Sequence, residues 1–296
     1  MSTADVDAPP EVIHPANRWT RLTAAGRRLD LTTVPVMASV AFLGFILLCA
    51  VFPHLLTSHQ PVAPDMSATL LGPEAGHIFG TDELGQDVYA RVVFAVRPAV
   101  LVGVGSTAIA VVCGAILGMV SALTKPLIDT ITMRLLDVFV ALPSLLLALL
   151  IIAVFGTGTG QIIVAVGVAF IPPYARIVRG ETVSVRDSLH IESAVGLGIS
   201  RSRIVLVHIL PNAVRPILVL ATIGFGTSLL SASILSFLGL GVQPPAPDWG
   251  TMLSGARDYP DQWWLVLFPG LALTFTVVAV NIVGRTLRER NDKERR

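Results

Sequence analysis

The sequence predicts an all-α polytopic membrane protein that crosses a bilayer about six times. Of its 296 residues, 53% are hydrophobic and only 14% are charged, and the mean hydropathy is +0.74. A soluble domain carries about 25% charged residues. The deficit indicates that much of the surface faces lipid. Six long apolar stretches also approach the roughly 20 residues that one helical crossing requires.

These stretches cover residues 34–52, 99–123, 138–155, about 161–177, about 217–240 and 263–283. An ionisable side chain interrupts only the fourth, where Arg176 lies near its end. Pro172 and Pro173 are expected to kink or end this helix, because proline removes a backbone donor. In the second stretch, Gly114 and Gly118 in G-x-x-x-G spacing predict close helix packing. Residues 124–137 and 156–160 are expected to be short connections.

The first 33 residues are polar and contain several arginines. A cleavable signal peptide has a shorter polar start and a small-residue cleavage site. We therefore expect a cytoplasmic tail at 1–33, then an uncleaved membrane helix with an extracytoplasmic loop at 34–98. The main membrane domain is expected over 99–288, with a cytoplasmic loop at 179–215, followed by a cytoplasmic tail at 289–296.

The distribution of Lys and Arg near the helix ends predicts that both termini lie in the cytoplasm. In that orientation only Arg91, Arg97 and Arg257 fall outside. The inside receives the N-terminal arginines, Lys125, Arg134, Arg176, Arg179, Arg186, Arg201, Arg203, Arg215 and the C-terminal basic residues. One outer boundary also has the aromatic side chains typical of a membrane interface, namely Trp249, Tyr259, Trp263 and Trp264.

Motifs for catalysis and cofactor binding are missing from the sequence. It has no phosphate-binding G-x-x-x-x-G-K-[ST] loop, and the glycine-rich segment 156–160 lacks the lysine. Cys49 and Cys113 fall in apolar runs without the spacing of metal ligands. No ionisable group lies deep in a predicted span, as an intramembrane enzyme or proton-coupled carrier would need. We expect no catalytic, cofactor or metal site in this chain, and if it transports, we expect the energy to enter from elsewhere.

The fifth stretch is dotted with hydroxyl side chains, of which Thr227, Ser228 and Ser231 are expected to share one face. Two interpretations are open. Such hydroxyls often form hydrogen bonds between membrane helices. They can also form a mildly polar wall along a translocation pathway.

A helix–turn–helix is predicted between the fourth and fifth membrane helices. Asp187 or Ser188 is expected to cap its first helix, and Gly196 and Gly198 to end it, since glycine tolerates a left-handed backbone. Ser200 is expected to cap the second helix and Pro211 to stop it. Attachment to two membrane helices favours docking of a protein over binding of nucleic acid.

This segment resembles the EAA loop of binding-protein-dependent ABC importers. The similarity rests on the consecutive residues Glu192, Ser193 and Ala194, then Gly198, and then Ile209, Leu210 and Pro211. Ser193 replaces the second alanine, and His208 stands where isoleucine is common. The resemblance implies that the loop forms a coupling helix in a groove of an ATPase subunit. Glu192 and Gly198 would then serve coupling, with Leu210 and Pro211 setting the exit into the fifth helix.

Residues 79–88, 235–245 and 249–250 resemble the C-type permease subunit of dipeptide, oligopeptide and nickel importers. Ala232 and Arg285 depart from that pattern. The resemblance implies a type I (MetI-like) permease fold in a bacterial cell membrane, non-catalytic and forming half of a peptide pathway. The implied partners are a B-type permease, two ABC ATPases, an extracytoplasmic binding protein and membrane lipid, and ATP would be bound by these partner ATPases.

Nickel, glutathione and haem are alternative cargoes, and a stand-alone secondary carrier is a further alternative. The outer segments 53–98 and 241–262 are the expected docking surface for the binding protein.

Overall fold

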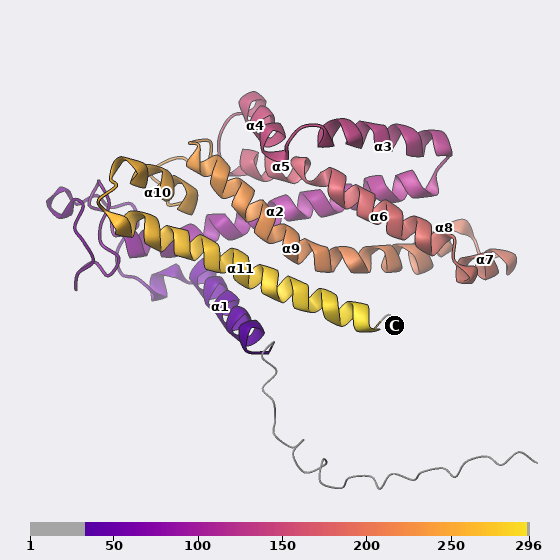
Figure 1. Ribbon diagram of the computed structural model, residues 1–296, viewed down its shortest axis with the longest axis horizontal. Coiled ribbons are helices and arrows are strands. Elements are labelled where there is room, and N and C mark those ends of the chain that lie inside the picture. Colours follow the sequence, from indigo (N-terminus) through magenta and orange to yellow (C-terminus); the bar gives the residue numbers. More distant parts are fainter. Residues whose placement is uncertain (1–32, 295–296) are drawn as a thin grey trace, which may run out of the picture.

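The computed structural model describes residues 33–294, apart from the side chains of residues 33, 214–216, 218 and 290–294. The described chain is helical, and its only bridges are two isolated ones, between Glu74 and His77 and between Thr81 and Asp87. Figure 1 shows an elongated bundle with α7 at one end. The helix α10 and the loop that precedes α2 lie at the other end.

Within the described residues, four helices are long and apolar enough to cross a membrane, and two bent helix pairs bring the number of candidate spans to at most six. The six predicted crossings agree with this upper number. The long helices are α1 (Thr33–Val51), α2 (Val88–Leu123), α9 (Leu210–Phe237) and α11 (Trp263–Glu294). The bent pairs are α3 (Pro126–Val140) with α4 (Ser144–Phe155), and α5 (Thr159–Ala169) with α6 (Ile171–Arg186).

Shorter elements occupy the two ends of the bundle. At one end lie α7 (Leu189–Gly196), α8 (Arg201–Arg203) and the π-helical η4 (Ile204–Ile209). At the other lie η2 (Pro53–Leu55), η3 (Met66–Ala68), α10 (Trp249–Gly255) and η5 (Ala256–Asp258).

The helix α2 begins at Val88, whereas the hydropathy pattern predicts a start at residue 99. The side chain of Asp87 caps it, since Oδ1 accepts the backbone N–H of Ala90 at 2.7 Å. The helix continues through Pro98. The last part of the predicted outer loop is therefore helical, and that boundary was wrong.

The third predicted span is also different, because α3 and α4 meet at an angle of 89°. Pro143 is the N-cap residue of α4, and its missing N–H favours the break. Residues 126–137, expected to be a connection, belong to the amphipathic helix α3. Two ion pairs hold α3 to α6: Asp129 with Arg179 and Asp137 with Arg176, each at 2.6 Å.

The predicted kink in the fourth span is confirmed, since α5 and α6 are inclined by 42° at Phe170. Pro172 and Pro173 occupy the first turn of α6, where a missing N–H costs no helical hydrogen bond.

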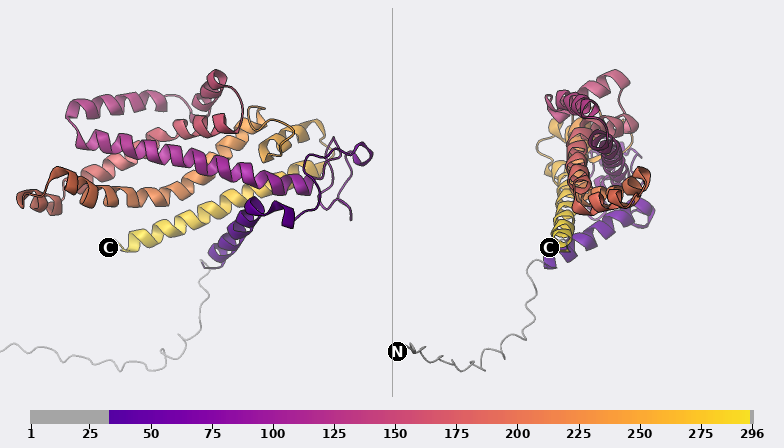
Figure 2. Two further views of the ribbon diagram at one scale, coloured as in Figure 1. Left: turned by 180° about the vertical axis from the view of Figure 1, so that it is seen from behind. Right: turned by 90° about the vertical axis from the view of Figure 1, so that its right-hand side faces the viewer.

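The helix α2 is the centre of the bundle and packs against α5, α6 and α9 (Figure 2). The predicted packing role of Gly114 and Gly118 is confirmed. A Cβ at Gly114 would lie 2.7 Å from Cβ of Tyr174, and one at Gly118 would lie 2.5 Å from the carbonyl oxygen of Ala175. Only glycine allows α2 and α6 to approach so closely.

The two predicted tails lie only partly within the described residues. Of the tail predicted at 1–33, all but Thr33 lies outside the described residues. In the segment predicted as a C-terminal tail, α11 continues to Glu294, and residues 295–296 lie outside the described part.

Candidate functional site

The candidate site is the loop between α6 and α9, which projects beyond the other helices (Figures 1 and 2). Its first helix, α7, has Ser188 at the N-cap position, with extended backbone angles of φ −78° and ψ 147°. The predicted side-chain cap is wrong, however. The hydroxyl of Ser188 donates to the carbonyl of Val185 at 2.7 Å. The carboxylate of Asp187 instead accepts the guanidinium of Arg186, which lowers the pKa of Asp187.

The end of α7 matches the sequence prediction. Gly198 has φ +78°, its N–H donates to Val195, and the N–H of Ile199 donates to the carbonyl of Ala194. This pair of hydrogen bonds is a Schellman motif, which requires a left-handed residue. Apart from its chain neighbours, no described residue has an atom within 4 Å of a Cβ built at Gly198, so the backbone angle alone explains the glycine.

The second helix of the loop does not stop at Pro211. Ser200 occupies the N-cap position of α8 without a side-chain hydrogen bond. The chain then runs through α8 and η4 directly into α9, in which Pro211 is the second residue. The missing N–H of proline falls where the hydrogen-bond pattern changes from π to α, so the helical path continues.

The loop is a folded unit fixed to the bundle. Ile191 and Ala194 of α7 are buried against Ile204 and Ile209 of η4, with exposed fractions between 2% and 5%. Leu123 at the end of α2 and Val185 of α6 pack against the same cluster. This cluster of Ile191, Ala194, Ile204 and Ile209 is called the loop core below. Because it includes contacts with α2 and α6, the position of α7 is tied to both helices.

A second contact joins the two halves of the loop. Nε2 of His190 on α7 lies 3.3 Å from Nδ1 of His208 on η4, and the two rings are at 72°. Sequence reasoning did not identify this pair, because it depends on how the helices pack.

The outer surface of α7 combines a carboxylate with apolar side chains. Glu192 and Ser193 are exposed, and Glu192 forms no ion pair within the described residues. Leu189 and Leu197 are 80% and 81% exposed. Exposed leucines around one charge on a rigid helix are typical of a protein-docking surface.

The predicted site residues therefore have different positions. Glu192 and Ser193 lie on the outer surface of α7, Ala194 points into the loop core, and Gly198 ends the helix. Leu210 and Pro211 form the start of α9. Sequence reasoning missed Leu189 and Leu197, although a leucine at each end of so short a helix was a visible signal.

The hydroxyls of α9 separate into two groups. Thr227 is exposed and Ser231 is partly exposed, whereas Ser228 is 2% exposed and accepts a hydrogen bond from Thr107 of α2 at 3.4 Å. The interpretation as a link between helices thus applies to Ser228. Thr227 and Ser231 are the two that lie toward the outside of the bundle.

Comparisons with known proteins agree with this architecture. Residues 110–296 match the family model of the binding-protein-dependent transport system inner membrane component. The chain is 36% identical to the dipeptide transport system permease protein DppC of Alkalihalophilus pseudofirmus, over 99% of this chain and 96% of that protein. It is 41% identical to the glutathione transport system permease protein GsiD of Escherichia coli O1:K1 / APEC, over 75% of this chain and 73% of that protein.

A solved chain of the MetNI methionine ABC transporter, in inward-facing conformations, aligns with a TM-score of 0.55 and 21% identity. The alignment covers 67% of this chain and 95% of that one, and it supports the MetI-like fold. The chain is therefore a permease subunit of the binding-protein-dependent ABC importer family, an inner-membrane component with several membrane-spanning helices.

Proposed function

We propose that this chain is the C-type permease subunit of a peptide importer and that α7 is its coupling helix. Both termini and α7 would then lie in the cytoplasm, and α10 would lie outside. The subunit would pair with a homologous B-type permease above two ABC ATPases. An extracytoplasmic binding protein would deliver the cargo.

The surface of α7 is the observation that carries this proposal. A coupling element must be accessible to its ATPase and yet rigid, so that displacement reaches the membrane helices. The exposed side chains of Glu192, Leu189 and Leu197 meet the first requirement. The Schellman stop at Gly198 and the loop core meet the second.

The replacement Glu192→Lys tests the docking role. It puts a cation where the exposed carboxylate would meet the ATPase, without disturbing the loop core. We expect the variant to reach the membrane in normal amounts, to retain less than a tenth of the ATPase subunits on purification, and to lose ATP-dependent uptake. A tenfold loss in affinity for the ATPase subunits corresponds to about 1.4 kcal/mol.

The matched control is Glu289→Lys, which makes the same charge change on an exposed residue of α11. Normal ATP-dependent uptake by the Glu192→Lys variant would show that α7 is not the coupling helix.

Peptide is the proposed cargo because DppC of Alkalihalophilus pseudofirmus, which aligns over almost its whole length, is named for dipeptide transport. The glutathione-named relative supports a second candidate. Competition of labelled dipeptide uptake by unlabelled glutathione, and the reverse, assigns the cargo. Transport by the purified chain alone in liposomes would favour the stand-alone carrier.

Along the pathway, we propose Thr227 and Ser231 as wall residues, since both lie toward the outside of the bundle.

A further inference from the structure

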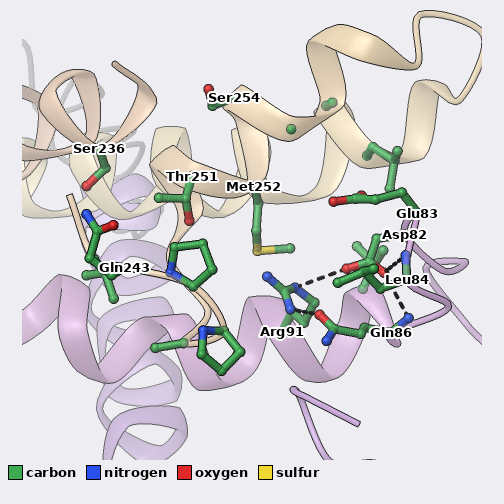
Figure 3. A pocket seen from close by; sticks show the side chains of 18 of the residues that line it. Asp82, Glu83, Leu84, Gln86, Arg91, Ser236, Gln243, Thr251, Met252 and Ser254 are labelled. Carbon is green, nitrogen blue, oxygen red and sulfur yellow. Dashed lines mark hydrogen bonds and ion pairs between the residues drawn. The ribbon is translucent and has the colours of Figure 1, made fainter. Parts of the chain in front are cut away.

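A cavity of about 510 Å³ lies at the end of the molecule opposite α7. Its walls come from segments far apart in the sequence: residues 82–91, the end of α9 with the turn that follows, and α10 with η5 (Figure 3). Two of the three segments that resemble the C-type subfamily, 79–88 and 235–245, thus meet around one space. Coupling through α7 does not account for either segment.

Two tryptophans fix these walls. The indole N–H of Trp249 on α10 donates to the carbonyl of Val92 on α2 at 3.1 Å. The indole N–H of Trp264 on α11 donates to the carbonyl of Thr81 at 3.1 Å. Both rings are buried, at 1% and 9% exposure. A cavity braced in this way is already formed before any ligand arrives, which lowers the entropy cost of binding.

The positive charge in the wall is already neutralised. Nε of Arg91 lies 3.4 Å from Oδ2 of Asp82, and its guanidinium also donates to the carbonyl of Pro61 and to Gln86. Burial raises the pKa of Asp82, and the charge of Arg91 opposes that rise. Arg91 and Asp82 therefore contribute almost no net charge to the space.

Two other carboxylates leave the cavity negative. Glu83 and Asp258 line it and form no ion pair within the described residues. Glu83 extends across the space toward α10, where a Cβ at Gly255 would lie 3.8 Å from its Oε1 (Figure 3). The nearby Arg257 is not part of the lining, and its guanidinium carbon lies 5.4 Å from the ring centroid of Phe237.

The rest of the lining mixes apolar side chains with uncharged polar ones. The apolar part comes from Met252, Leu265, Val242 and the prolines at 244 and 245, and the polar part comes from Gln86, Ser236, Gln243, Thr251 and Ser254. A partly apolar space whose net charge comes from two carboxylates suits a long side chain with a methylene stem and a cationic head, which is the chemistry of arginine and lysine. It disfavours phosphate and anionic lipid headgroups.

The cavity lies on the side of α9 away from the proposed pathway. Ser236, which lines it, comes nine residues after Thr227. At about 3.6 residues per turn, nine residues place the two side chains on opposite faces of the helix. A ligand in the cavity would therefore stay beside the pathway, as expected of a docking partner rather than of cargo in transit.

We propose that this cavity receives an arginine or lysine side chain of the extracytoplasmic binding protein, with Glu83 and Asp258 as its ion-pair partners. The inference rests on the proposed function, which places this end of the molecule outside. The sequence predicted a docking role for the outer segments 53–98 and 241–262 as a whole. The proposal narrows that role to one cavity and to one kind of side chain on the partner.

The test uses the complete importer in lipid nanodiscs and measures the Kd of its binding protein. We expect Glu83→Lys combined with Asp258→Lys to weaken binding at least about 10-fold at low salt, and less at high salt, because salt screens exposed charges. Ser254→Trp, which fills the cavity without changing its charge, should weaken binding similarly. The control Glu289→Lys changes an exposed carboxylate on α11, 24 residues beyond the cavity-lining Leu265, and should stay within about twofold of wild type.

The outcomes are distinct. Unchanged affinity in both the charge-reversed and the filled variants would overturn the proposal. Weaker binding in Ser254→Trp alone would overturn the cationic occupant. The variants could instead bind the binding protein with wild-type affinity but change the preference of uptake between free and N-acetylated peptides. This result would overturn the proposal and would indicate that the cavity receives the amino terminus of the cargo. If the wild-type importer captured no binding protein at all, the proposed function itself would fail. Basal ATPase activity confirms that each variant is assembled.

Discussion

At the scale of single residues, Gly198 has the clearest backbone reason for its identity. Its φ of +78° would cost a side-chain-bearing residue roughly 1–2 kcal/mol, and the space around it is open. We expect Gly198→Ala to increase amide hydrogen exchange in α7 by about 5- to 30-fold. The matched control is Gly196→Ala, inside the helix and also in open space, which should protect α7 slightly. Equal exchange in the two variants would refute the backbone explanation.

Asp248 gives a prediction for pH dependence. Its carboxylate caps α10 by accepting the N–H of Thr251 at 3.0 Å, and burial raises its pKa above the ordinary value of 3.8. The folded protein therefore takes up this proton at higher pH than the unfolded chain. Stability from this group is greatest at low pH and is lost as the pH rises from 3.8 through the raised value.

Asp248→Asn keeps an oxygen acceptor for the cap and removes the titration. The thermal midpoint of the wild type, relative to this variant, should therefore fall as the pH rises from 4 toward neutrality. Unfolding followed in detergent at several pH values measures the difference. If the thermal midpoint of the wild type instead rose relative to that of Asp248→Asn over this pH range, the predicted direction of the pH dependence would be wrong.

At the scale of elements, α3 depends on its attachment to α6. The guanidinium of Arg179 donates two hydrogen bonds of 2.6 Å to Asp129, which also accepts the hydroxyl of Ser121. Since both partners are partly exposed to solvent, we expect Arg179→Ala to cost about 1 kcal/mol. The more exposed pair of Arg176 and Asp137 is the matched control, and Arg176→Ala should cost less than about 0.5 kcal/mol.

Thermal unfolding gives the stability change, and distances between spin labels on α3 and α6 report whether α3 has moved. Restoration by the exchanged pair, Asp129→Arg with Arg179→Asp, would support the attachment. An equal loss in the two alanine variants would argue against a special role for the pair of Asp129 and Arg179.

The elements also show what the sequence could predict. Apolar stretches long enough for a bilayer identified the crossings, and Gly198 identified the end of α7, because both signals are local. The helix α3 was missed because Asp129, Arg134 and Asp137 interrupt its apolar pattern, and two of them are satisfied by α6, far away in the sequence. The loop core and the cavity likewise depend on tertiary contacts that no local pattern contains.

At the scale of the whole molecule, the chain leaves many apolar side chains uncovered. On α3, the exposed fractions are 58% to 69% for Leu127, Leu135 and Val138. On α4, they are about 70% for Val154 and Phe155. A bilayer accepts such surfaces, and so does a second membrane subunit. The proposed pairing with a B-type permease gives these helices an alternative to lipid.

The length of α2 has a mechanical consequence. This single helix of 36 residues packs against the loop core with Leu123 at one end and lines the far cavity with Val88 and Arg91 at the other. At about 1.5 Å per residue it is a rod of about 54 Å, so a tilt of about 5° around its middle would move each tip by about 2 Å in opposite directions. A displacement at one end of the subunit would thus be transmitted through α2 to the other end. The close contact between α2 and α6 lies nearer to the end that carries the loop core.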